Sequence, residues 1–239
     1  MRLYIMQLGV NPTMGSSPYP GYLIQAGDGS NILVDTGFGP EMVAISRRPD
    51  HQGARVTDDD LVVNQLERLG VRPKDIRYLI ATHFDGDHAG YLAAFPDAEV
   101  VVQRRHYEVA KSGHPRFAKT REQWGDPRLR YRLVDGDTEL LPGVELIETS
   151  GHVPGHQSVL VRLPKTGPVL LAIDAISHAL GDHTPENRPM TQFDLDESGT
   201  RASTRRLVDL ASREKVALIV YGHDPDEWKK LKKAPKFYE

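Results

Sequence analysis

The side chains with the clearest chemistry lie in residues 79–90, which read LIATHFDGDHAG. An apolar run ends here, and His83, Asp85, Asp87 and His88 follow within six residues. Imidazole and carboxylate groups bind zinc, iron or manganese when thiolates are lacking. A solvated turn with incidental histidines is the simpler alternative. Four potential ligands placed directly after an apolar run favour a metal site.

Three further candidates occur in the same local context, each at the end of an apolar run. They are His152 after 146–149, Asp174 after 169–173, and His223 after 217–221. An Asp that closes a buried strand is often only a turn cap, which is the simpler interpretation of Asp174 taken alone. Four separate strand ends that deliver His or Asp fit one shared site better.

The composition restricts the chemistry further. The chain has 239 residues, ten His and no Cys, so thiolate catalysis, disulfides and iron–sulfur sites are excluded. The formal net charge of −3 lacks the basic excess that binds nucleic acid or anionic membranes. No apolar run approaches the ~20 residues that span a bilayer, and residues 1–6 predict a first strand. We therefore expect a cytoplasmic protein with a single domain over 1–239.

Short apolar runs separated by Gly and Pro predict a fold rich in strands. The predicted strands are 2–8, 20–26, 31–35, 76–81, 98–102, 130–134, 144–149, 157–163, 168–173 and 216–221. The predicted helices are 58–69, 103–111, 198–214 and 225–231. Residues 38–57 and 177–197 fit neither pattern, and unassigned polar stretches of that length are usually functional. The coarse pattern suggests two packed sheets with helices outside.

The run His83-x-Asp85-x-Asp87-His88 resembles the His-x-His-x-Asp-His signature of the metallo-β-lactamase superfamily. The other family pieces follow in order: Asp35-Thr36-Gly37, Gly151-His152, Asp174 and Gly222-His223. Within that superfamily, residues 151–158, 222–228 and 231–238 are similar to the N-acyl homoserine lactonase group. The resemblance implies an α/β fold, the αββα sandwich, in which two mixed β-sheets are flanked by helices.

The same resemblance implies roles for the candidate residues around two divalent metal ions, for which zinc is expected and iron or manganese are alternatives. One metal would be held by His83, Asp85 and His152. The other would be held by Asp87, His88 and His223, with Asp174 between the two. His156 is expected to orient its loop by hydrogen bonds or simply to cap it.

Asp85 departs from the family signature, which has His at this position. A carboxylate can ligate the same metals, but Asp is shorter than His and would bind weakly if it did not reach. Its negative charge lowers the net positive charge of the site. We therefore expect a less acidic bridging water and more tolerance for hard metals.

A second departure concerns the substrate. Lactonases of this group commonly carry a Tyr three positions after the bridging Asp, and Ser177 occupies that position here. Ser177 or His178 is a candidate replacement. Residues 10–20 have the composition of a pocket rim. The residues Phe38, Met42 and Phe193 are candidates for an apolar wall around an acyl chain, or they simply pack the loops.

The implied reaction is attack on a lactone or ester carbonyl by a metal-bridging hydroxide, with Asp87 passing a proton to the leaving oxygen. Such a lactonase would be a quorum-quenching enzyme with a small-molecule substrate, without nucleic-acid or membrane partners, and we expect a homodimer. Thioester or phosphodiester hydrolysis on the same scaffold is an alternative. A third interpretation is an iron-dependent redox protein, because flavodiiron members of the superfamily also carry a carboxylate at the position of Asp85.

Overall fold

The strands of the protein form two mixed β-sheets, and the computed structural model describes all 239 residues. The first sheet has six strands in the order β1-β2-β3-β4-β5-β6. Their bounds are β1 Arg2–Asn11, β2 Ser17–Gln25, β3 Asn31–Val34, β4 Ile76–Ile80, β5 Glu99–Gln103 and β6 Arg130–Val134. The first three strands are antiparallel, and β3 to β6 run parallel.

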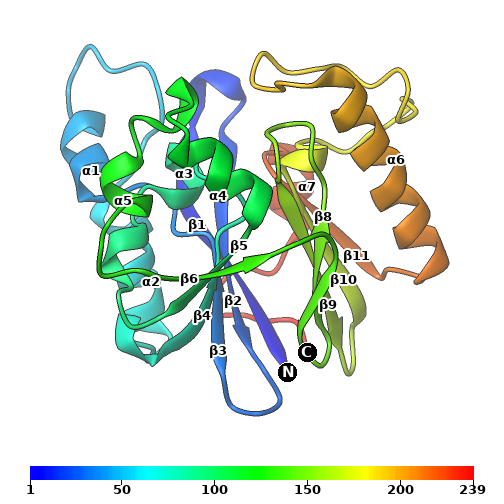
Figure 1. Cartoon of the computed structure of the whole chain (residues 1–239), viewed down its shortest axis with the longest axis horizontal. Helices are drawn as coiled ribbons and strands as arrows, with labels where there is room; N and C mark the ends of the chain where they lie inside the picture. Colours follow the sequence, from blue (N-terminus) through cyan, green and yellow to red (C-terminus); the bar gives the residue numbers. More distant parts are fainter.

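The second sheet has five strands in the order β11-β10-β9-β8-β7. Their bounds are β7 Thr138–Leu141, β8 Val144–Glu148, β9 Gln157–Leu163, β10 Gly167–Ile173 and β11 Leu218–Tyr221. Strands β7 to β10 are antiparallel, whereas β11 pairs parallel with β10. Figure 1 shows the two sheets facing each other across the centre of the molecule.

Helices cover the outer face of each sheet (Figure 1). The helices are α1 Pro40–Ser46, α2 Val62–Arg68, α3 Gly86–Ala89, α4 Arg104–Lys111, α5 Arg121–Trp124, α6 Glu197–Arg213 and α7 Pro225–Lys230. Six 3₁₀ turns are Pro12–Met14, Asp58–Asp60, Pro73–Asp75, Leu92–Ala94, Pro115–Phe117 and Asp174–Ile176. This arrangement confirms the predicted αββα sandwich.

The period-2 alternation of side chains explains the layers. In β5, Val101 points into the core between the sheets, while Val100 and Val102 point into the core under α2 and α4. On the second sheet, Leu170 packs with Leu207 of α6 in a separate outer core. A sheet buried on both faces needs such continuous apolar runs, and burying them is the main force that holds the layers together.

The strand predictions hold, with β7 missed because its four residues are too short and polar to show a pattern. The helix predicted over 58–69 is divided into a 3₁₀ turn and α2, because Leu61 takes an extended backbone with ψ of 130°. The unassigned stretch 38–57 contains α1. The stretch 177–197 is irregular up to Asp196, the N-cap of α6.

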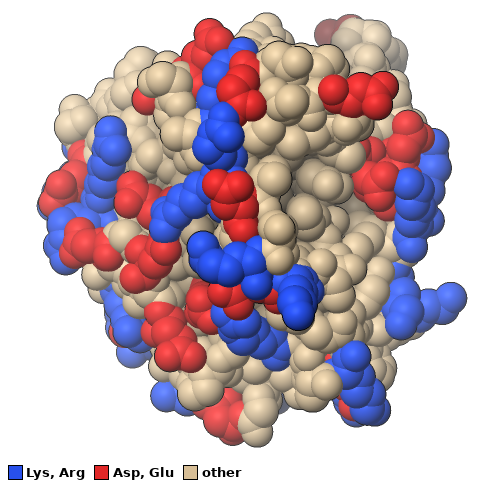
Figure 2. Space-filling view, turned by 90° about the vertical axis from the view of Figure 1, so that its right-hand side faces the viewer, with Lys and Arg blue, Asp and Glu red and all other residues tan.

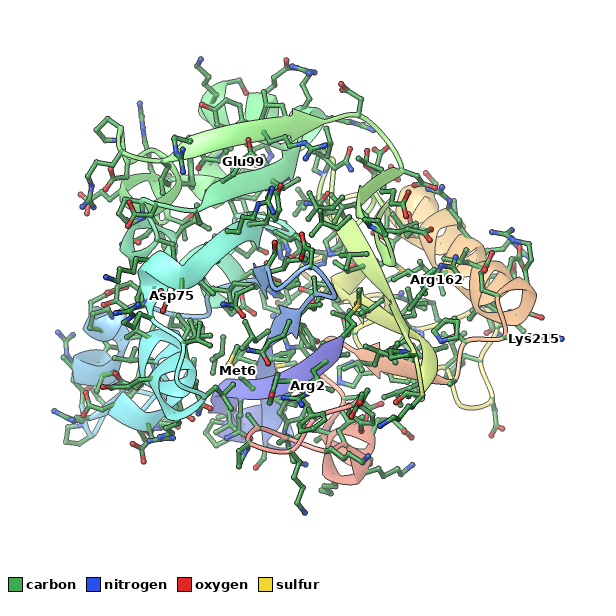
Figure 3. All side chains as sticks on the ribbon, turned by 90° about the horizontal axis from the view of Figure 1, so that it is seen from below. Arg2, Met6, Asp75, Glu99, Arg162 and Lys215 are labelled. Carbon is green, nitrogen blue, oxygen red and sulfur yellow. The ribbon has the colours of Figure 1, made fainter.

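Charges of both signs are interspersed on the face that carries α6 (Figure 2). Arg201 pairs with Glu197 at 2.7 Å on this helix, and Arg162 of β9 pairs with Glu214 at 3.0 Å. Figure 3 views the molecule from below, where Asp75 precedes β4 and Glu99 begins β5. The carboxyl ends of these parallel strands therefore point to the opposite end of the molecule. None of the helices has both the length and the apolar character of a bilayer-spanning segment.

Candidate metal centre

The predicted ligands come from loops at the carboxyl ends of strands in both sheets. His83 follows β4, and the short helix α3 carries Asp87 and His88. His152 follows β8, while Asp174 comes directly after β10 and His223 two residues after β11. The register of the paired strands fixes where each of these loops begins. Loops that begin at the same edge of the sheets can bring their side chains together.

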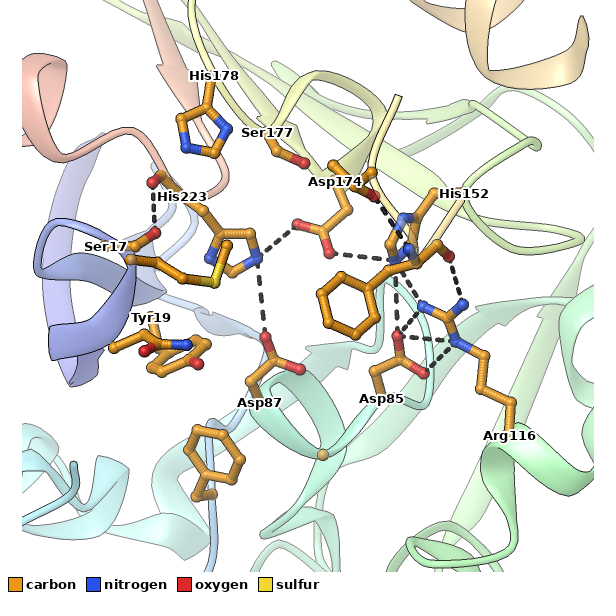
Figure 4. A pocket seen from close by; sticks show the side chains of 16 residues that line it. Ser17, Tyr19, Asp85, Asp87, Arg116, His152, Asp174, Ser177, His178 and His223 are labelled. Atoms are coloured by element: carbon orange, nitrogen blue, oxygen red, sulfur yellow. Dashed lines mark hydrogen bonds and ion pairs between the residues drawn. The ribbon is translucent and has the colours of Figure 1, made fainter. Parts of the chain in front are cut away.

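The structure brings all seven predicted residues together, and Figure 4 shows the five of them that line the cavity. They form three overlapping groups whose potential ligand atoms lie within 4.8 Å of one another. The groups are His83, His88 and Asp174; His83, Asp85 and His152; and Asp87, His88 and His223.

The carboxylate of Asp174 lies between the two halves of this cluster. Its Oδ2 atom is 3.2 Å from His152 Nε2, and its Oδ1 atom is 3.0 Å from His223 Nε2. Asp85 lies on the first side, with Oδ2 3.3 Å from His83 Nε2 and 3.5 Å from His152 Nε2. We call residues His83, Asp85 and His152 the first half-site, and residues Asp87, His88 and His223 the second half-site.

The backbone before Asp174 is strained. Ile173 has φ of 54° and ψ of −140°, a conformation that β-branched residues rarely adopt. Such a backbone conformation lowers the free energy of unfolding by about 1–3 kcal/mol and persists only where the surrounding structure enforces it. Ile173 is nevertheless fully packed in the core between the sheets. The strain turns the chain at the end of β10 as it enters the 3₁₀ turn that begins with Asp174.

The outer ring nitrogen of each of the four histidines is hydrogen-bonded, which fixes how the rings are oriented. Asp35 Oδ2 accepts from His88 Nδ1 at 2.8 Å. The other three pairs are His83 Nδ1 with Thr82 Oγ1 at 3.1 Å, His152 Nδ1 with Asp194 Oδ1 at 3.1 Å, and His223 Nδ1 with the Pro18 carbonyl at 2.9 Å. Metal-binding histidines have this arrangement, in which the partner of one nitrogen sets the tautomer of the other.

When the rings are neutral, the inner nitrogens present lone pairs to the centre of the cluster. Nε2 of His83 and Nε2 of His88 are fully buried and have no hydrogen-bond partner. A buried polar atom without a partner costs about 1–3 kcal/mol, so an unsatisfied pair calls for an explanation. A divalent cation would satisfy both atoms, and the donor set of imidazole and carboxylate suits zinc, iron or manganese.

The carboxylates control the protonation of the cluster in the absence of a cation. Burial lowers the pKa of His152, but Asp174, Asp194 and Asp85 outweigh it and raise that pKa to about 9. His83 differs, because burial and the neighbouring His88 hold its pKa below the usual value. Binding a cation therefore requires protons to leave the cluster.

Asp35 supports this arrangement from the predicted Asp-x-Gly turn. It is fully buried, adopts a left-handed φ of 59°, and accepts from Thr82 N at 2.9 Å and Thr82 Oγ1 at 2.8 Å as well as from His88. One carboxylate thus joins the end of β3 to the start of the ligand loop.

We expect Asp35→Asn to weaken cation binding by roughly 10–100-fold, because the amide cannot accept all three hydrogen bonds and His88 loses its orientation. Asn tolerates the left-handed backbone, so the fold should persist. Competition with a chromophoric chelator measures the affinity, and circular dichroism checks the fold. An affinity equal to that of the unmodified protein would contradict this role.

Gly222 is required because its neighbours are too close for a side chain. A Cβ at this position would lie 2.7 Å from both Asp174 Oδ1 and the Ile173 carbonyl oxygen. We expect Gly222→Ala to move the Asp174 carboxylate, weaken cation binding and destabilise the protein by about 1–3 kcal/mol. Gly27→Ala is a matched control, since nothing lies within 4 Å of its added Cβ. Equal melting temperatures and cation affinities for the two variants would refute this expectation.

A cavity of about 410 Å³ opens over the cluster. Asp85, Asp87, His152, Asp174 and His223 line its floor. Its walls are lined by Met14, Tyr19, Phe38 and Phe193. Met14 and Tyr19 belong to the predicted rim 10–20, and Phe38 and Phe193 to the predicted apolar wall. Met42 is the exception, since it packs beside Val43, Val56 and Leu61 outside the cavity. Ser177 and His178 both line the cavity, near Asp174 and His223 in Figure 4.

Sequence reasoning missed Arg116 and Asp194, which contact the ligands, and His106, which binds the backbone of Phe84 beside His83. Asp194 lies in the unassigned stretch 177–197, so its only signal was the unusual length of that polar loop. Arg116 follows Pro115 in a 3₁₀ turn and forms an ion pair with Asp85. His106 lies in the first turn of α4, 22 residues after Phe84, and nothing in its spacing indicated that it reaches Phe84.

His156 lies beside the cluster without joining the three groups. Its Nδ1 atom is 2.8 Å from Thr149 Oγ1, and its backbone carbonyl accepts from Thr149 N at 2.8 Å. These bonds close the loop that carries His152, which agrees with the expected structural role.

Comparison with known proteins identifies the family. A family model described as the metallo-beta-lactamase superfamily matches residues 18–223, which is most of the chain and includes every predicted ligand. The chain belongs to the metallo-β-lactamase superfamily. Within it, an N-acyl homoserine lactonase from a Bacillus species is 36% identical over 228 residues, covering 90% of this chain and 85% of that protein.

Two further relatives extend the comparison. The N-acyl homoserine lactonase AttM from Azorhizobium caulinodans is 34% identical and covers 100% of this chain and 99% of its own. A solved structure of an N-acyl homoserine lactone hydrolase, with the product N-hexanoyl-L-homoserine at its catalytic metal centre, matches with a TM-score of 0.85 and 30% identity. It covers 99% of this chain and 98% of that chain. The overall fold and the lactonase-like sequence thus agree along nearly the whole chain.

Proposed function

We propose that this protein is a metal-dependent hydrolase that opens N-acyl homoserine lactones or related carboxylic esters. The observation that carries the proposal is the histidine arrangement, in which four outer nitrogens are hydrogen-bonded and the inner nitrogens face one cluster. The lactonase relatives support the choice of substrate class. They favour neither thioester nor phosphodiester cleavage, nor an iron-dependent redox role.

The proposed ligands are the seven residues of the cluster. The first half-site would hold one divalent cation, the second half-site would hold another, and Asp174 would contact both. We propose zinc as the native metal. Two cations held there would lower the pKa of a bound water and polarise the substrate carbonyl.

Asp87 is the proposed proton carrier. Its side chain lines the cavity and is 21% exposed, so it is accessible to substrate. Burial opposes its ionisation, but the adjacent His88 and His223 outweigh burial and hold its pKa below the usual value. An ionised Asp87 can accept a proton at a carboxylate oxygen and deliver it to the leaving alkoxide oxygen when the ring opens.

The cavity walls fit a substrate with one polar and one apolar end. Tyr19 stacks edge-on to Phe38, with ring centroids 5.1 Å apart, and Met14 lines the same cavity. These side chains suit an acyl chain. Burial raises the pKa of Tyr19 to about 12, so its hydroxyl stays protonated and can donate to a substrate oxygen.

A hydrolysis screen tests the proposal. Protein reconstituted separately with zinc, manganese and iron is assayed with a pH indicator against N-acyl homoserine lactones of several chain lengths, thioesters, phosphodiesters and a β-lactam. We expect lactone opening to be the fastest reaction and to disappear with a chelator. A faster thioester or phosphodiester reaction, or lactone opening that survives complete metal removal, would overturn the proposal.

Lactone opening would make the protein a quorum-quenching enzyme, and this biological role is part of the proposal. The expected homodimer and the single domain over 1–239 both stay predictions. Sedimentation analysis checks the first, and a single cooperative unfolding transition checks the second.

A further inference from the structure

The two half-sites differ in one contact. The guanidinium of Arg116 lies over the first half-site and binds two of its three residues (Figure 4). Its Nε atom donates to Asp85 Oδ1 at 2.8 Å and to Asp85 Oδ2 at 3.0 Å. Its Nη2 atom donates to the same Oδ2 and lies 2.9 Å from His152 Nε2. No Lys or Arg is paired with Asp87 in the second half-site.

Arg116 uses the same atoms that a cation would need. Arg116 Nη2 lies only 2.9 Å from His152 Nε2, so a cation cannot bind that nitrogen while the guanidinium stays in place. Asp85 Oδ2, the oxygen nearest His83 and His152, is likewise the oxygen that Arg116 Nη2 contacts. A cation can bind the complete first half-site only after the guanidinium has moved.

The charge of Arg116 also opposes cation binding at the first half-site. Arginine remains protonated in proteins, so it neutralises Asp85 and adds a positive charge beside the place where a cation would sit. The pair is largely shielded from water, since the side chains of Arg116 and Asp85 are only 15% and 16% exposed. Screening is weak in such surroundings. The second half-site keeps the full negative charge of Asp87.

The guanidinium is also held from the opposite side. Arg116 Nη1 donates to the Phe193 carbonyl oxygen, and the next residue, Asp194, accepts from His152 Nδ1. Arg116 is therefore fixed by the ligand loop and by the 177–197 stretch together. The fold therefore holds Arg116 over the first half-site, and its side chain is not free to move as an unpaired surface side chain would be.

We propose that Arg116 competes with metal for the first half-site, so that the two half-sites load unequally and the second half-site fills first. This inference rests on the proposed metal centre. Arg116 acts here on metal binding, not on the reacting atoms. The structure predicts that removing its charge strengthens binding of the second metal equivalent while leaving the first nearly unchanged.

Titration of the metal-free full chain with cobalt tests this without an activity assay. Calorimetry gives the affinities, and the visible absorption of bound cobalt reports each coordination step. For the unmodified protein we expect two phases, the second at least tenfold weaker. Arg116→Met should tighten the second phase at least tenfold and change the first by less than about twofold. Arg128→Met is the matched control, because Arg128 pairs with Asp126 at 2.7 Å on the exposed surface.

Two further variants assign the phases. His152→Ala should remove the weak phase, and His223→Ala should remove the tight phase. Two equivalents of equal affinity in the unmodified protein, or an unchanged weak phase in Arg116→Met with a native circular dichroism spectrum, would overturn the competition. Failure to bind any cobalt would instead overturn the proposed metal centre itself, so the two failures are distinguishable.

Discussion

Asp87→Asn is expected to lower lactone turnover by about 10²–10⁴-fold, the usual contribution of a positioned general acid or base. The amide has nearly the same size and keeps one oxygen toward the second half-site, but it cannot carry a proton. His88 and His223 remain in place, so we expect this variant to keep much of its bound metal. Loss of turnover without a matching loss of metal distinguishes proton transfer from ligation.

Steady-state kinetics with a lactone, combined with metal analysis of the same sample, measure both quantities. Asp97→Asn is a suitable control because Asp97 is exposed and outside the cavity. His88→Ala should instead lose metal directly, since it removes a ligand from the second half-site. Turnover near that of the unmodified protein in Asp87→Asn would remove Asp87 from the mechanism.

Stability in acid is expected to depend strongly on His106, a fully buried residue of α4. Its Nδ1 atom donates to the Pro154 carbonyl at 2.8 Å, and its Nε2 atom accepts from Phe84 N at 2.9 Å. These bonds fix one neutral tautomer and tie the loop carrying His83 to the loop carrying His152. Protonation would break the bond to Phe84, and burial lowers the pKa of His106 to about 3.

The direction of the effect follows from linkage. The ordinary pKa of 6.5 applies in the unfolded chain, so that state takes up a proton between about pH 6.5 and pH 3 while the folded state does not. The stabilising contribution of neutral His106 is complete above pH 6.5 and is lost as the pH falls toward 3. The shift sets an upper bound on the order of 5 kcal/mol on this contribution.

Replacing His106 tests this contribution. His106→Gln should lose about 1–3 kcal/mol at pH 7.5, because Gln cannot reproduce both bonds in the same geometry. It should also show a shallower fall in unfolding free energy between pH 6.5 and 4. Urea unfolding in the presence of a chelator keeps metal from contributing to the measured stability. His183→Gln, at an exposed position, is the control, and parallel pH profiles for His106→Gln and unmodified protein would contradict the expected role.

Periodicity in the sequence predicted most of the fold because strands such as β5 and β9 are buried on both faces and appear as apolar runs. β7 escaped because an edge strand with an exposed Glu139 has no such pattern. The 58–69 helix is divided at Leu61, where the side chains of Asn64 and Gln65 donate to the Asp58 and Asp59 carbonyls. The spacing of apolar residues does not reveal where local side-chain hydrogen bonds outweigh helix propensity.

The candidate site was predictable where ligands follow strands. The residues His83, His152, Asp174 and His223 each come at such an end, and the structure places them together. Arg116 was not predictable, because nothing near Pro115 indicates that its turn folds back over Asp85. Contacts between segments distant in sequence depend on the whole fold. This is why Arg116, Asp194 and His106 emerged only from the structure.

The unfavourable backbone of Ile173 has a consequence for engineering. Replacement by Gly relaxes the turn but also removes a buried side chain, so neither form is free of a penalty at the residue that precedes Asp174. Selection for heat resistance alone would reward variants that straighten this turn. We expect such variants to survive higher temperatures and to degrade their substrate more slowly, a trade-off common where a protein retains local instability for its chemistry.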